Sequence, residues 1–204
     1  MTKLRPFIWI ACLALLPQTA LAHLVSTRFG EFYSGMLHPV TTLLHLLPWL
    51  AIALLCGIQR QQSYSKWALL LFPGATLVGA LIGSQFLHPD WIYLINTTSF
   101  LIGLLVALAL KLNPLVFIAL LCMFGFSHGF ANGEPGLRGS DFVLYVSGVA
   151  AAAYLLVTLI SAAAKLTITR APWGIVAVRA VGSWIMAVGI LHIGFTLMIP
   201  AGLE

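Results

Sequence analysis

The sequence predicts an all-α integral membrane protein, a bundle of six transmembrane helices that follows a cleavable signal peptide. The first observation behind this prediction is composition, since 61% of the 204 residues are hydrophobic and only 7% are charged. Soluble domains carry roughly 25% charged residues, so a water-soluble fold is excluded. The second observation is a mean hydropathy of +1.03. The third is a series of apolar runs, each close to the length that crosses a lipid core.

The amino-terminal segment 1–22 is predicted to be the signal peptide. It begins with two basic residues, continues with a run of ten apolar residues, and ends in the small-residue pattern Ala20-Leu21-Ala22. Cleavage there would leave one membrane domain, residues 23–204, with His23 at its new amino terminus. An uncleaved first span is the alternative, because short membrane anchors share these features.

Six apolar runs are predicted to be the spans, since a lipid core demands about 20 apolar residues of a helix. They lie at 34–58, 67–87, 91–112, 114–131, 142–168 and 173–199. The first contains Pro39 and Pro48, which remove backbone donors and release carbonyl groups. The second, third and sixth begin at a tryptophan, whose ring prefers the membrane interface. The second and fourth carry glycines four residues apart, which lets helix backbones approach closely, and the fifth is predicted from its apolar length alone.

The placement of charge orients the predicted bundle. With the mature amino terminus outside, the basic residues gather in or near the inner connections, at Arg60, Lys66, Lys111, Lys165, Arg170 and Arg179. All five carboxylates then fall on the outer side, and an even number of spans places the carboxyl terminus outside as well. This pattern predicts a multi-pass protein of the bacterial cytoplasmic (inner) membrane. It accounts for the net charge of +5 without a nucleic-acid partner.

All six histidines fall in the outer half of the predicted bundle: His23, His38, His45, His88, His128 and His192. His38 and His45 are seven residues apart, which places them on one helical face but about 10 Å apart along a straight axis. They could share one ion only if Pro39 or Pro48 distorts the helix. The outer half of the third span also carries a polar quartet, residues 96–99, that would line a wet vestibule or tie helices together.

Histidine inside a membrane needs a partner or water, so these residues are candidate metal ligands. Neutral imidazole together with the nearby carboxylates of Glu134 and Asp141 suits nickel, cobalt or zinc. A structural hydrogen bond is the alternative for any single membrane histidine. For His192, a deep ligand and a packed interhelical donor are both open. His88, which precedes a proline, is predicted to mark a surface turn.

Two short segments stand out in the first and fourth spans. One is His38-Pro39-Val40-Thr41-Thr42-Leu43-Leu44-His45, and the other is Phe126-Ser127-His128-Gly129-Phe130-Ala131-Asn132-Gly133-Glu134. They resemble the H-P-x-x-G-x-D-H signature and the H-G-x-A-H-G-type segment of the HupE/UreJ family of nickel and cobalt permeases. Length, signal peptide and number of spans are similar to that family over nearly the whole chain. The resemblance implies metal-binding roles for His38, His45, His128 and Glu134.

The chain departs from the family pattern at four positions. Thr42 stands where the family has glycine, Leu44 where it has aspartate, and Phe130 and Asn132 where histidine is frequent. Without the aspartate, less negative charge offsets a divalent cation in a low-dielectric site. The resemblance therefore implies a lower affinity or a different preferred ion.

These observations together predict a permease that takes up a divalent transition-metal ion. Nickel or cobalt is the favoured substrate, with zinc and copper as further candidates, and no permanently bound cofactor is expected. His23 would capture the ion first, His38 and His128 would form an upper site, and His45 with His192 a lower one. The expected partners are the metal ion and the lipid bilayer, and a homo-oligomer or a membrane partner stays open.

Other functions also stay open. The inner half offers no carboxylate or histidine and so no evident exit path, which leaves a non-transporting, outward-facing metal-binding or sensing subunit as an alternative. Two axial histidines from different helices would also suit a haem-binding membrane protein. An enzyme is not predicted, because the sequence has no nucleophile elbow, zinc-protease motif or phosphate-cradling glycine loop.

Overall fold

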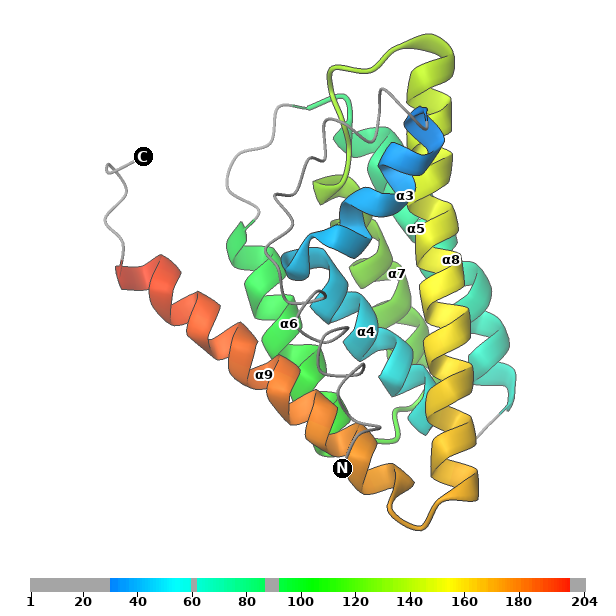
Figure 1. Cartoon of the computed structure of the whole chain (residues 1–204), viewed down its shortest axis with the longest axis vertical. Helices are drawn as coiled ribbons and strands as arrows, with labels where there is room; N and C mark the ends of the chain where they lie inside the picture. Colours follow the sequence, from blue (N-terminus) through cyan, green and yellow to red (C-terminus); the bar gives the residue numbers. More distant parts are fainter. Residues whose placement is uncertain (1–29, 60–61, 87–91, 199–204) are drawn as a thin grey trace, which may run out of the picture.

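The computed structural model of the chain describes residues 30–59, 62–86 and 92–198. Within those ranges every regular element is a helix (Figure 1). In chain order they are α3 (Glu31–Thr41), α4 (Leu43–Ile58), α5 (Gln62–Gly83), α6 (Ile92–Ala107), α7 (Pro114–Ala131), α8 (Gly139–Arg170) and α9 (Gly174–Met198). The predicted all-α class is confirmed there. The predicted signal peptide, His23 and His88 lie outside these ranges.

Four helices, α5, α7, α8 and α9, are long and apolar enough to cross a membrane. The pair α3 and α4 passes the same test as one unit and would make a fifth crossing. Helix α6 is shorter, with 16 residues. The chain is therefore a multi-pass helical protein of the kind that the hydropathy predicts, while the count of six spans stays a prediction.

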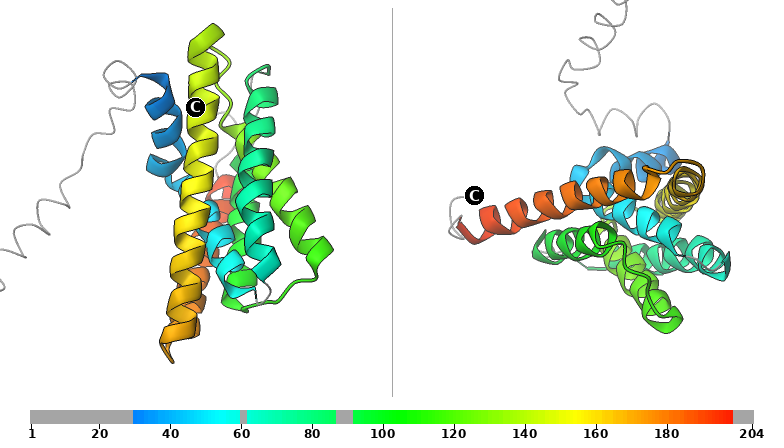
Figure 2. Two further views of the ribbon diagram at one scale, coloured as in Figure 1. Left: turned by 90° about the vertical axis from the view of Figure 1, so that its right-hand side faces the viewer. Right: turned by 90° about the horizontal axis from the view of Figure 1, so that it is seen from below.

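From α4 to α9 successive helices run in alternating directions, so the helix ends gather at two opposite ends of the bundle (Figures 1 and 2). At one end the Gln59 side chain, which follows α4, donates to the Leu110 carbonyl and accepts from the Leu112 amide. Arg179 of α9 donates to the Ala107 carbonyl at the end of α6. We call this the basic end, because it carries Lys66, Lys111, Lys165, Arg170 and Arg179.

The opposite end, which we call the acidic end, is formed where α3 begins, α7 ends and α8 begins. It carries Glu31, Glu134 and Asp141, which are all the carboxylates in the described ranges, together with Arg138. The separation of acids from most bases that the sequence predicts is therefore present in the folded bundle.

The first predicted span, 34–58, is covered by two helices in the structure and not by one continuous helix. Helices α3 and α4 meet at Thr42, which is extended (φ −95°, ψ 109°), and their axes are bent by 78°. Pro39 in α3 and Pro48 in α4 each remove one backbone hydrogen bond near this junction. A continuous helix would thus form fewer backbone hydrogen bonds there than elsewhere. Breaking the helix at this point therefore costs less free energy.

Helix α6 also ends well before residue 112, the predicted limit of the third span. Ala109 takes the left-handed conformation (φ 50°), and the Leu110 amide closes the helix on the Leu105 carbonyl at 3.0 Å. Alanine is an unusual residue for this conformation, so nothing local in the sequence signals the stop. The Gln59 side chain supplies hydrogen bonds to the connection that leaves the helix.

Helices α5 and α7 cross at glycines on both partners. A methyl group at Gly79 or Gly83 of α5 would overlap the backbone of α7, and one at Gly125 or Gly129 of α7 would overlap that of α5. This confirms the packing role predicted for the first pair and shows that the second pair serves the same contact. The crossing fixes the last turns of α7, which carry His128.

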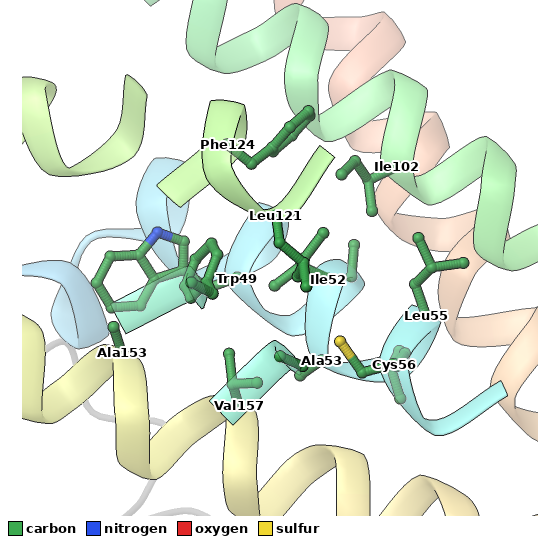
Figure 3. Packing of buried hydrophobic residues seen from close by; sticks show 14 of the residues in the cluster. Trp49, Ile52, Ala53, Leu55, Cys56, Ile102, Leu121, Phe124, Ala153 and Val157 are labelled. Carbon is green, nitrogen blue, oxygen red and sulfur yellow. The ribbon is translucent and has the colours of Figure 1, made fainter. Parts of the chain in front are cut away.

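The apolar core surrounds α4 (Figure 3). Trp49, Ile52 and Leu55 are fully buried, and they pack among residues that include Phe72 of α5 and Leu121 of α7. The Trp49 and Phe72 rings meet edge to face with centroids 5.7 Å apart. This apolar layer occupies the part of the bundle between the first turn of α4 and the basic end.

Candidate metal-ion site

The position of His38 depends on a close crossing of α3 over α8. Gly35 of α3 lies against the backbone of Tyr145, and Gly148 of α8 lies against the backbone of Phe32. A Cβ at either glycine would overlap a carbonyl oxygen of the other helix, so the crossing requires both. His38, one turn beyond Gly35, then faces the Tyr145 ring with centroids 6.5 Å apart.

The bend at Thr42 brings His38 and His45 together. A straight helix would separate them by about 10 Å along its axis. In the folded chain their ring centroids are 5.9 Å apart. His38 is half-buried, whereas His45 is buried. The helix distortion that a shared ion would require is therefore present.

His128 continues this series from a third helix. It lies in the last turns of α7, is buried, and places its ring centroid 6.0 Å from that of His45. Phe124, four residues earlier, stacks on the His128 ring with centroids 6.0 Å apart. We call His38, His45 and His128 the histidine row, because each ring contacts the next along the sequence of the three.

Hydrogen bonds orient the two buried rings of the row. Thr98 of α6 lies with its Oγ1 3.1 Å from Nε2 of His128. Asn132, which caps the end of α7, lies with its Nδ2 3.1 Å from Nδ1 of His45. The same Nδ2 donates to the His128 backbone carbonyl at 2.7 Å. Both rings are thus held by polar groups of other helices.

Two buried polar atoms at this site have no hydrogen-bond partner within the described part of the chain. They are Nδ1 of His128 and Oδ1 of Asn132. An unpaired buried polar atom costs about 1–3 kcal/mol, so such atoms call for a ligand or a functional reason. An imidazole nitrogen and an amide oxygen are both electron-pair donors that a metal cation accepts.

The other predicted ligands lie around this row. Glu134 is exposed in the connection between α7 and α8, and its carboxylate acts electrostatically on His38. Asp141 is exposed in the first turn of α8. His192 is half-buried near the end of α9, a helix that packs chiefly on α6. His45, predicted to share a lower site with His192, has ring contacts with His38 and His128.

The histidine row does not enclose one point. Among the residues that the structure describes, no group of three or more histidine, cysteine, aspartate or glutamate side chains is placed to hold one metal ion together. The rings follow one another with successive centroid distances of 5.9 and 6.0 Å. This geometry suits stepwise contacts along a path better than a closed structural metal cage.

The role of Asn132 is not evident from the motif, where it stands only as a departure from histidine. The spacing could have indicated this role, because residues four apart lie on one face of a helix and His128 is four residues before Asn132. In the sequence, Thr98 stands out only as one member of the polar quartet. Its contact with His128 depends on how α6 packs, which no local pattern reveals.

An apolar helical bundle in which three helices bring histidine rings together at the carboxylate-bearing end is typical of a multi-pass membrane protein that handles metal cations. The chain belongs to the HupE / UreJ family, since the sequence profile described as HupE / UreJ protein matches residues 11–192. That family is linked in general to nickel and cobalt transport, and its members are transporters or accessory proteins. No match to the chain was found among curated proteins or among solved structures.

Proposed function

We propose that the protein takes up a divalent transition-metal ion, nickel or cobalt, across the bacterial cytoplasmic membrane. The observation that carries the proposal is the histidine row, in which the bend at Thr42 turns two distant positions of one span into neighbours. Family membership supports it, because the family is linked to transport of these two metals. Nickel and cobalt are also borderline ions that bind imidazole nitrogen well.

The acidic end is the entrance in this proposal. The positive-inside rule favours placing the basic end in the cytoplasm, which leaves Glu31, Glu134 and Asp141 on the outer side. Their negative charge raises the local concentration of cations. His38, half-buried near Glu134, is the first ring of the row that an arriving ion meets, and His45 and His128 follow more deeply.

The row offers neutral ligands. Leu44 stands beside His45 without a carboxylate to offset the charge of a divalent ion, so the site stabilises the cation only through nitrogen and oxygen lone pairs. Weak binding of this kind suits passage, since an ion that is held tightly leaves slowly. Zinc and copper, which also bind imidazole, are the natural competitors.

Metal accumulation in cells tests the proposal. Nickel, cobalt, zinc and copper would be offered separately to cells that express the wild type, His38→Ala, His128→Ala or Thr158→Ala. Thr158 is a half-buried residue of α8 whose side chain bonds only its own helix in the described contacts, so it serves as the matched control. We expect nickel or cobalt uptake to fall at least about tenfold in both histidine variants, because even groups that support a ligand contribute 10–100-fold to metal affinity. Unchanged accumulation of all four metals in His38→Ala would remove that residue from the path.

A second function, a metal-binding subunit that does not transport, is favoured by the apolar layer below the row. Trp49, Ile52 and Leu55 fill the space between His45 and the basic end, and within the described ranges neither a histidine nor a carboxylate lies at that end. Purified protein in liposomes separates the two functions. A permease moves external nickel or cobalt into the lumen, whereas a receptor binds the ion and leaves the lumen empty.

A further inference from the structure

Asn132 is the least explained residue of the candidate site. It is 1% exposed, and its backbone amide bonds the last carbonyls of α7, so the side chain projects from a fixed point. The side-chain NH₂ group contacts two partners at once, the His128 backbone carbonyl and the His45 ring. Its position therefore links the end of α7 to the first turn of α4.

The orientation of this amide follows from chemistry. A backbone carbonyl only accepts hydrogen bonds, so the Asn132 atom 2.7 Å from the His128 carbonyl must be the NH₂ group. The second hydrogen of the same NH₂ then points to Nδ1 of His45, 3.1 Å away. Rotating the amide would set its oxygen against the His128 carbonyl oxygen, which is repulsive.

This orientation determines the tautomer of His45. Nδ1 must present a lone pair to the Asn132 hydrogen, so a neutral His45 carries its proton on Nε2. Neither ring nitrogen is then free for a cation, because one lone pair is occupied and the other nitrogen is protonated. His128 differs, since its Nδ1 has no partner within the described residues.

We propose that Asn132 is a positioning residue that holds His45 in a form unable to bind metal and releases it when the ion arrives. The inference rests on the proposed function and adds a determinant of its affinity. Ligation through Nδ1 requires the amide to leave, and ligation through Nε2 requires a proton on Nδ1, which would face the NH₂ group. Either route breaks the Asn132 contact, so the contact opposes binding and favours release.

Two measurements test this inference, and the first uses the metal-free wild type. Nitrogen chemical shifts of ¹⁵N-histidine-labelled protein in detergent micelles report which nitrogen of His45 is protonated. We expect the Nε2-protonated form, with conversion to a mixture of tautomers in Asn132→Leu. Finding the Nδ1-protonated form in the wild type overturns the inference, whether or not the variant folds.

The second measurement is the affinity of purified protein for Ni²⁺ and Co²⁺ by calorimetry. Asn132→Leu removes the donor, and Asn113→Leu removes the capping residue at the opposite end of the same helix as a matched control. We expect Asn132→Leu to bind about three- to tenfold tighter, the range that one net hydrogen bond spans, and Asn113→Leu to bind like the wild type. Equal or weaker binding by Asn132→Leu, with a wild type that binds, overturns this inference alone. No binding by any variant, the wild type included, overturns the proposed function as well.

Discussion

The crossing of α3 over α8 allows a sharp test of what positions His38. In Gly35→Ala the new Cβ would overlap the Tyr145 carbonyl oxygen and lie 2.8 Å from its carbonyl carbon, where ordinary contact begins near 3.4 Å. Relief of the carbon contact alone requires α3 to retreat by about 0.6 Å, and relief of the oxygen contact requires more. The obstacle is backbone of a long helix, so α8 yields little.

Two effects of this substitution oppose each other. Forcing a methyl group into a packed contact costs about 1–3 kcal/mol, whereas replacing glycine by alanine inside a helix favours folding by about 0.5–1 kcal/mol. Gly74→Ala in α5 isolates the second effect, because a Cβ there meets nothing within 4 Å. The difference in unfolding free energy between the two variants should therefore be about 1–3 kcal/mol, with Gly35→Ala the less stable.

The assay is unfolding by SDS titration in mixed micelles, followed by tryptophan fluorescence, together with nickel uptake in cells. Gly35→Ala should lose uptake more than stability explains, since His38 moves away from His45 with α3. Gly148→Ala places a methyl group into the same crossing from α8, so it should lower both stability and uptake in the same way. Equal stability of Gly35→Ala and Gly74→Ala, with normal uptake in both, would refute the idea that this crossing positions His38.

Two further predictions concern the basic end and pH. Gln59→Leu should lower the unfolding free energy by about 1–3 kcal/mol, because the Leu110 carbonyl and the Leu112 amide lose their side-chain partner. Gln85→Leu, at an exposed position, serves as the control and should change the unfolding free energy by less than about 0.5 kcal/mol. Equal SDS midpoints for the two variants would contradict this prediction. Metal uptake should fall as the external pH is lowered through the range in which the ligating imidazoles become protonated, because a proton competes with the metal ion for the ring lone pair and only the neutral ring binds metal. A steady rise of radiolabelled nickel uptake over that range would argue against histidine ligands.

The helices themselves were predictable because a lipid core imposes a length and a composition on each. The bounds of α7, predicted at 114–131, agree with Pro114–Ala131, and α9 begins one residue from the predicted 173. The gathering of bases and acids at opposite ends also follows from the chain, since every reversal of direction sends the next connection to the other end. These features need only local information.

Tertiary structure decided the features that matter most for the candidate site. The prolines signalled a distortion, but the site of the break at Thr42, its 78° bend and the 5.9 Å approach of His38 to His45 depend on where α3 rests against α8. The connection that follows α6 is hydrogen-bonded by the side chain of Gln59, a residue more than 50 positions earlier that follows α4.

Sequence alone thus determined which segments are helical and how charge divides between the two ends, because hydrophobicity and charge act residue by residue. Only the folded bundle decided that Asn132 meets His45 and that Thr98 meets His128. Those contacts join residues 87 and 30 positions apart, and they exist only when three helices pack at one set of distances and rotations. No periodicity within a single segment encodes such a meeting.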